Sequence, residues 1–135
     1  MPKRAVGGSR PAGAYSPGIV AEGRFVYVSG QGPLRDGAVA GESIAEQTRI
    51  TLENLAAVLA AAGAGPDDVV RCGVFLADMA DFAEMNSVYG EFFADPLPAR
   101  TTVGAVLAGF KVEIDCVAVL PGAERSAGEG TCPGR

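Results

Sequence analysis

The stretch 43-SIAEQTRITLENLAAVLAAAGAGPDDVVRCGVFL-76 decides the fold, because it predicts a long helix followed directly by a strand. Ser43 and Glu46 have the spacing of a capping box, in which each side chain satisfies a backbone N–H of the first helical turn. Gly63 is well placed to end this helix. The apolar residues in between fall mostly on one stripe, at Ile44, Leu52, Leu55, Val58, Leu59 and Ala62. Alternation of apolar and other residues over Val69 to Leu76 then indicates a half-buried strand.

Further elements lie on both sides of this unit. Asp81 and Glu84 repeat the capping spacing and open a second helix, which Pro96 ends. β-Branched and aromatic runs between turn signals predict strands over 24–29, 38–40, 101–107 and 111–120. Residues 1–18 hold many glycines and prolines and predict no regular element, and the Gly-rich polar segment 121–135 is predicted to be a disordered tail.

This order of elements predicts an α+β fold with a single domain over residues 1–120. Two helices would pack on one face of a single sheet. The other face of the sheet must be buried as well, and no third helix is available to cover it. We therefore expect that face to meet another copy of the chain.

Composition narrows the possible functions. The 135 residues have 48% apolar and 20% charged side chains, which is typical of a globular domain. A net charge of −5 with only 11 Lys and Arg disfavours a dedicated nucleic-acid binder. No run is long and apolar enough for a membrane span, and the first residues do not resemble a signal peptide. We expect a cytoplasmic protein without nucleic-acid or membrane partners.

Histidine is absent, which removes the commonest general base and metal ligand and every Ser-His or Cys-His nucleophilic arrangement. Cys72, Cys116 and Cys132 are odd in number and lack CxxC spacing, so neither a disulfide framework nor a zinc site is expected. Cys72 and Cys116 should be inert core residues. We expect no metal site.

Two charged residues are candidates for chemistry. Glu113 shares a face of its strand with Asp115 and apolar residues, and could transfer protons; by spacing alone, a solvent-facing or salt-bridged carboxylate is favoured. Arg100 lies where a proline-rich loop enters a strand, and its planar fork could bind a carboxylate. The alternative, slightly favoured, is a surface arginine that caps the second helix or pairs with Asp95.

Other candidates are weak when each is taken alone. Ser29 and Gly30 end a strand where the backbone could approach a ligand, although a tight turn also explains them. Tyr15 lies in a loop and could close or cover a pocket. Asn86 lies in a helix interior that disfavours asparagine, so it could reach a partner.

Taken together, these residues belong to a recognisable pattern. The matching runs cover about residues 11 to 120, in order: 13-GAYSP-17, 28-VSGQ-31, 74-VFLADM-79 with Asp81, Phe82, Asn86, Tyr89, Phe92 and Phe93, then 98-PARTTV-103 and 111-KVEID-115. This pattern resembles the RidA (YjgF) family of enamine/imine deaminases. The resemblance implies a chorismate-mutase-like fold with one mixed sheet, assembled as a homotrimeric barrel with clefts between subunits.

The resemblance also implies an activity. Its members hydrolyse reactive 2-enamino and 2-imino acids, such as 2-aminoacrylate and 2-iminopropanoate, to a 2-keto acid and ammonia without a cofactor. Arg100 would clamp the substrate carboxylate, and Glu113 would position or deprotonate the attacking water. Tyr15 would close the cleft from the neighbouring subunit. Orientation of the substrate would fall to Ser29, Gly30 and Thr102, with Asn86 as support.

Some positions depart from the family pattern. Ala14 replaces a proline, Thr102 replaces a cysteine found in many members, and the segment 104–110 is about two residues shorter. Two alternatives to the deaminase stay open. One is a non-catalytic trimer that binds small carboxylates or acts like a chaperone. The other is the RNA-cleaving translation inhibitor activity attributed to some relatives, which the acidic, histidine-free composition disfavours.

Overall fold

The structure is a computed structural model that describes residues 2–122, so the predicted tail lies mostly outside the described residues. Its centre is one mixed sheet of four strands in the order β3-β8-β6-β7. These strands are β3 (Phe25–Gln31), β8 (Val112–Val119), β6 (Val69–Leu76) and β7 (Ala99–Gly104). β7 runs parallel to β6, and the other neighbours are antiparallel. The predicted α+β fold with one mixed sheet at its centre is confirmed.

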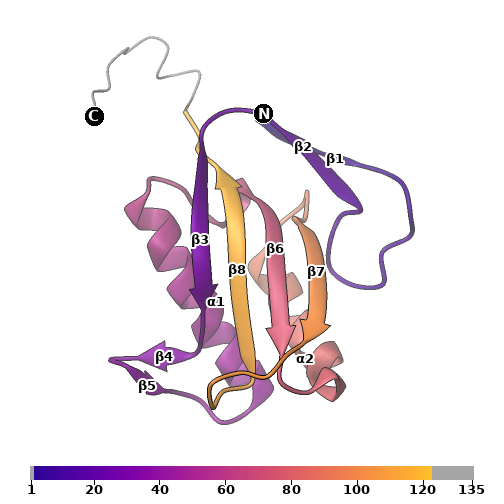
Figure 1. Cartoon of the computed structure of the whole chain (residues 1–135). Helices are drawn as coiled ribbons and strands as arrows, with labels where there is room; N and C mark the ends of the chain where they lie inside the picture. Colours follow the sequence, from indigo (N-terminus) through magenta and orange to yellow (C-terminus); the bar gives the residue numbers. More distant parts are fainter. Residues whose placement is uncertain (1, 123–135) are drawn as a thin grey trace.

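Two helices, α1 (Ile44–Ala61) and α2 (Phe82–Phe92), lie on the same side of this sheet (Figure 1). Short elements complete the described chain: the strand pair β1 (Lys3–Val6) and β2 (Gly18–Ala21), the strand pair β4 (Leu34–Arg35) and β5 (Ala38–Val39), and the 3-10 turns η1 (Pro66–Asp68) and η2 (Met79–Asp81). The arrangement of both helices on one face agrees with the sequence-based expectation.

The start of α1 is the predicted capping box. The Ser43 hydroxyl accepts a hydrogen bond from the Glu46 backbone N–H at 3.0 Å, and Glu46 Oε1 accepts from the Ser43 N–H at 3.1 Å. These bonds satisfy donors that the first helical turn would otherwise leave unpaired. At the other end, Gly63 adopts a φ of +88°, a conformation that glycine reaches without steric cost.

The core lies between the helices and the sheet. Leu52, Leu55 and Leu59 of α1 are at most 1% exposed, and they face strand residues that are equally buried. In β8, the even-numbered residues from Val112 to Ala118 point into this core, and the alternating residues, including Glu113, point to the other face. Each fully buried leucine contributes about 1.5–3 kcal/mol relative to an exposed one. The helices therefore hold the sheet from one side only.

Residues 1–18 contradict the expectation of no regular element. Lys3–Val6 forms β1, which pairs antiparallel with β2 from Lys3 opposite Ala21 to Val6 opposite Gly18. The glycines and prolines that argued against structure are concentrated in residues 7–17, in the loop between the two strands. The pairing is not local, because the paired residues are between 12 (Val6 and Gly18) and 18 (Lys3 and Ala21) positions apart, and composition alone does not reveal it.

The second face of the sheet carries no helix of the described chain (Figure 1). Tyr27 is 76% exposed and Val103 is 44% exposed, and their register partners Val117 and Phe75 lie on the same face as Glu113. Large apolar side chains in such a patch are typical of a surface that another protein covers. Association with another copy of the chain stays a prediction.

We predict that Ser43→Ala lowers the free energy of unfolding by about 1 kcal/mol, because a helix start loses its capping acceptor. Chemical denaturation followed by circular dichroism measures this change. Ser87→Ala, the same substitution at an exposed position inside α2, is the control and should leave stability within about 0.5 kcal/mol. Equal stability of the two variants would contradict the role of the cap.

Candidate functional site

Arg100 lies on the helix-facing side of β7, at the edge of the sheet. It stands beside Cys72 of β6, which in turn pairs with Cys116 of β8. The side chain is only 9% exposed, and three aromatic rings surround its guanidinium. Its Cζ lies 4.8 Å, 5.0 Å and 5.4 Å from the ring centroids of Tyr89, Tyr15 and Phe82 respectively. Rings at this distance attract a cation by about 0.5–2 kcal/mol each.

The guanidinium is poorly satisfied by hydrogen bonds. Its Nη1 donates to the Ala14 carbonyl over a long 3.5 Å, whereas Nε and Nη2 are buried without a partner. Within residues 2–122 the ion pair present joins Arg35 and Glu53 at the surface, so Arg100 does not pair with Asp95. The alternative of a surface arginine is therefore wrong. Burial lowers the pKa of Arg100, yet a guanidinium stays protonated in proteins.

An unpaired buried cation is energetically expensive, with an effective cost of several kcal/mol. A bound carboxylate would offset this cost, because its two oxygens match the parallel N–H groups of a guanidinium. Arg100 thus has the donors, the charge and the burial of an anion-binding group.

A short segment of the N-terminal loop lies directly over Arg100. The Ala14 N–H donates to Asn86 Oδ1 at 2.9 Å, which explains why an asparagine is present inside α2. A Cβ at Gly13 would lie 2.7 Å from Arg100 Nη2 and 2.8 Å from Asn86 Oδ1, so only glycine fits there without a shift. The resemblance implies that Tyr15 approaches from a neighbouring subunit; the structure instead places it against Arg100 of its own chain.

Thr102 adds a second polar atom to this group. It follows Arg100 by two residues on β7 and therefore points to the same face of the sheet. Its Oγ1 is buried and has no hydrogen-bond partner, and the same holds for the hydroxyl of Tyr89. Burial raises the pKa of Tyr89, so this hydroxyl is a neutral group beside the cation. Arg100, Thr102, Tyr15 and Asn86 form what we call the arginine group.

Glu113 belongs to a second cluster on the opposite face of the sheet. The half-buried Glu113 side chain lies over Gly30 of β3, and a Cβ at position 30 would overlap its carboxylate. Ser29 precedes this glycine at the register shift between Val28 and Gln31. The Phe110 ring packs against Gly32, since a Cβ there would lie 3.2 Å from the ring. Ser29, Gly30, Glu113 and Phe110 form the glutamate group.

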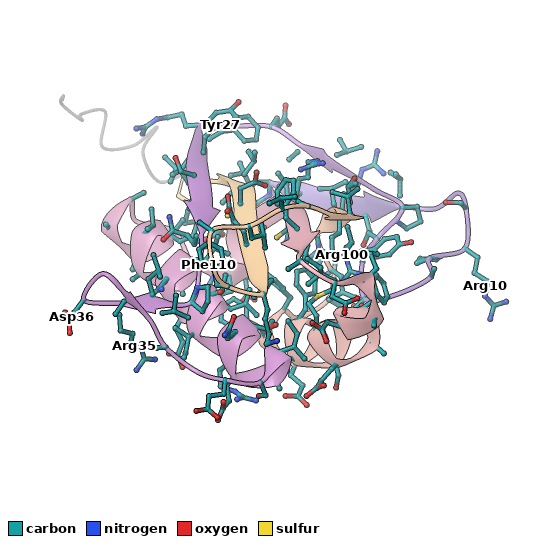
Figure 2. The ribbon with its side chains drawn as sticks, turned by 60° about the horizontal axis from the view of Figure 1, so that its bottom comes forward. Arg10, Tyr27, Arg35, Asp36, Arg100 and Phe110 are labelled. Carbon is teal, nitrogen blue, oxygen red and sulfur yellow. The ribbon has the colours of Figure 1, made fainter. Side chains whose placement is uncertain are left out.

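The two groups do not meet within one chain. Arg100 is on the helix-facing side of an edge strand, whereas Glu113 points away from the helices on β8, with β6 between them. Figure 2 shows Arg100 toward the N-terminal loop and Phe110 at the β3 and β8 side. The predicted site residues are therefore divided into two sets that lie on different faces of the protein.

Sequence reasoning missed three aromatic contributors to these groups. Phe82 and Tyr89 enter the sequence analysis only as part of the family pattern, although their spacing of seven residues puts both on the side of α2 that faces Arg100. Phe110 was treated as part of a shortened loop. The available signal for Phe110 was its position directly after Gly109, since an aromatic residue at a break between two strands can contribute to a site.

The two described cysteines are core residues, as expected. Cys72 is fully buried and Cys116 is 3% exposed, and neither forms a disulfide. Burial raises the pKa of the Cys72 thiol to about 12, so it carries no thiolate near neutral pH. Cys132 lies outside the described residues. Within residues 2–122, no cluster of Cys, Asp and Glu has an arrangement that could hold a metal ion, and no helix is long and apolar enough to cross a bilayer.

Known proteins are similar to this chain in sequence. A family model described as endoribonuclease L-PSP matches residues 7–120. The mitochondrial protein mmf2 of Schizosaccharomyces pombe is 46% identical over 73% of this chain and 82% of its own length. The chloroplastic Reactive Intermediate Deaminase A of Arabidopsis thaliana is 39% identical over 80% of this chain and 59% of its own length.

Solved structures agree with this relationship. The crystal structure of Escherichia coli TdcF with bound serine is 35% identical, has a TM-score of 0.66, and is matched over 86% of this chain and 93% of that one. The family model alone covers well over half of the sequence. The chain belongs to the endoribonuclease L-PSP family, the family of the YjgF and RidA proteins.

Proposed function

We propose that this protein hydrolyses small 2-imino acids and their 2-enamino tautomers to a 2-keto acid and ammonia. The observation that carries the proposal is the buried guanidinium of Arg100, which has two unpartnered nitrogens and, among residues 2–122, no acidic side chain to pair with. Such a group fits a carboxylate. Two relatives add support: one is named Reactive Intermediate Deaminase A, and the TdcF structure contains serine, which carries a carboxylate.

We propose further that the complete site forms between copies of the chain. The arginine group lies at the β7 edge, and the glutamate group lies on the other face near β3, at the opposite edge of the sheet. Contact between the β7 side of one subunit and the β3 side of the next would bring the two groups together. It would also cover exposed apolar residues such as Tyr27 and Val103. A homotrimer follows from the resemblance.

The proposed reaction needs little beyond orientation. Arg100 holds the substrate carboxylate with two parallel hydrogen bonds, which places the adjacent imine carbon. Glu113 accepts a proton as the water oxygen bonds to the carbon of the protonated imine, and the C=N electrons move to nitrogen. Glu113 then returns this proton to the amine of the carbinolamine. The C–N bond breaks and ammonia leaves as the carbinolamine hydroxyl gives its proton to the Glu113 carboxylate and the C=O bond forms. Holding the reactants in this geometry supplies much of the rate enhancement.

The other residues would adjust the substrate position. Ser29 and the backbone of Gly30 lie beside Glu113, and Thr102 offers an unpaired hydroxyl beside Arg100. Tyr15 closes over the guanidinium, and Asn86 supports the segment that carries it. No step requires a cofactor. The proposed location is the cytoplasm, although some relatives are named as mitochondrial.

Carboxylate binding without turnover is the second candidate, because Arg100 supports it equally well and the TdcF structure contains an amino acid. It differs from the first in leaving Glu113 without a role. RNA cleavage, which the family description mentions, is disfavoured by the net charge of −5 and the absence of histidine.

We predict that Arg100→Lys lowers kcat/KM by at least about a hundredfold, because an ammonium group lacks the planar fork. The assay generates 2-aminoacrylate with a dehydratase and follows keto-acid formation above the rate in buffer. Arg35→Lys, at the exposed ion pair, is the control and should keep wild-type activity. A wild-type rate no faster than buffer would refute the proposed function.

Removal of the Glu113 carboxylate should separate the two candidates. For Glu113→Ala we expect affinity for serine or pyruvate within about threefold of wild type, since Arg100 supplies most of the binding, and loss of turnover. Isothermal titration measures the affinity, and the keto-acid assay measures the rate. Unchanged turnover in this variant would contradict a role for Glu113 in the reaction, whereas binding without turnover in the wild-type protein would favour the non-catalytic candidate.

A mixing experiment tests the shared site. Arg100→Ala and Glu113→Ala proteins, each inactive, are unfolded together and refolded, so that subunits exchange. Random assembly should restore about a quarter of the wild-type activity, because some sites then combine an intact arginine with an intact glutamate from another subunit. Sedimentation should give a mass close to three times 13.7 kDa. No recovery from a mixed oligomer would contradict a site built from two chains.

A further inference from the structure

We infer that Lys3, far from Arg100 in the sequence, is a positioning residue for the arginine group. It acts by anchoring the N-terminal strand pair, which carries the loop segment Gly13–Tyr15 over the guanidinium. This inference rests on the proposed function for its kinetic consequence only. The anchoring of the loop by Lys3 concerns residues 2–122 and does not depend on the proposed function.

Lys3 is an unusual lysine, because its side chain is only 5% exposed. Its ammonium group donates to the Val69 carbonyl at 2.8 Å and to the Pro96 carbonyl at 3.4 Å. No carboxylate of the described part of the chain lies within ion-pair distance of it, although Asp67 and Asp68 are close enough to favour its charge. A lysine is buried in this manner only when it has hydrogen bonds to make, since burial of the charge is costly.

The two bonds join the first strand to the first residue of β6 and to the segment that precedes β7. Pro96 is the first residue of the segment Pro96–Pro98, and all three of its carbonyls accept hydrogen bonds from the N-terminal region. Lys3 Nζ donates to Pro96, Ser16 Oγ donates to Leu97 at 2.6 Å, and the Ser16 N–H donates to Pro98 at 3.1 Å. Arg100 follows Pro98 by only two positions in the sequence.

The strand pair and its loop are therefore attached to the segment Pro96–Pro98 at two points: at Lys3, at the end of the strand pair remote from the loop, and at Ser16, at the end of the loop. Lys3 starts β1 and Ser16 lies just before β2, and the two strands pair along their whole length. Between them runs the segment with Gly13, where a Cβ would lie 2.7 Å from Arg100 Nη2 and would force a shift. Figure 1 places this strand pair on the β7 side of the sheet. Loss of the Lys3 bonds would release β1, and β2 alone would hold the segment less firmly.

This arrangement assigns Lys3 an effect on substrate binding rather than on the chemical step. Gly13–Tyr15 and Asn86 enclose the guanidinium that would bind the carboxylate. The glutamate group lies on the other face, and within residues 2–122 no hydrogen bond joins it to the segment Gly13–Tyr15. A looser segment should raise KM, because it lowers binding of substrate and transition state alike, and leave kcat nearly unchanged.

The deciding measurement is hydrogen exchange of the peptide that covers residues 11–17, followed by mass spectrometry. Lys3→Met keeps the length and the apolar stem of the side chain but removes its donors. The control is Arg4→Met, which removes the same charge from an exposed position of the same strand. We expect exchange in residues 11–17 to be at least about tenfold faster in Lys3→Met than in Arg4→Met, with α1 unchanged.

Either equal exchange in the two variants or a parallel increase in α1 would overturn the inference, since the latter indicates general destabilisation. Kinetics provide the second test, with a KM raised about fivefold or more and a kcat within twofold in Lys3→Met. Equal changes in kcat and KM would contradict a positioning role. An inactive wild-type protein would refute the proposed function, whereas hydrogen exchange would still decide the role of Lys3.

Discussion

The burial of one guanidinium is the constraint around which the functional half of this fold is arranged. Arg100 has little access to water, and it lacks an acidic partner among residues 2–122. Aromatic rings from the N-terminal loop and from α2 supply part of the missing solvation. A bound ligand would supply the remaining solvation of the guanidinium. Without a ligand, the desolvation of this charge lowers the stability of the folded chain. A protein retains such a charge in its interior when the charge has a use.

Several otherwise unrelated features follow from this constraint. Asn86 is placed inside a helix because its amide oxygen holds the loop that covers the arginine. Gly13 is required because both polar groups approach it closely. The N-terminal strand pair exists beside β7 because the carbonyls of Pro96–Pro98 accept its hydrogen bonds. Each interaction is modest, but together they keep the guanidinium in one orientation.

The position of Glu113 has a different cause. Strand alternation in β8 directs it away from the helices, onto the face that also exposes Tyr27 and Val103. A single sheet cannot bring side chains from opposite faces into one site. This geometry explains why association of subunits, predicted from the lack of a third helix, and the proposed chemistry depend on each other. The same surface would both bury apolar area and complete the site.

Much of the fold was predictable because its signals are local. The capping box at Ser43, the stripe of leucines in α1 and the alternation in β8 depend on neighbours within one or two turns or pleats, and all of them are confirmed. The pairing of β1 with β2 was not predictable from composition, because its partners are separated by the glycine- and proline-rich loop. The same limit hid the contacts of Phe82 and Tyr89 with Arg100.

The sequence by itself determined which residue types are available for chemistry: an arginine, a glutamate, no histidine, and a pattern shared with one family. Tertiary structure alone decided that Arg100 is buried rather than exposed, that Tyr15 contacts it within the same chain, and that Glu113 lies on the other face. The physical reason is that residue identity and periodicity are encoded locally. Burial, by contrast, depends on which distant segments pack over a side chain.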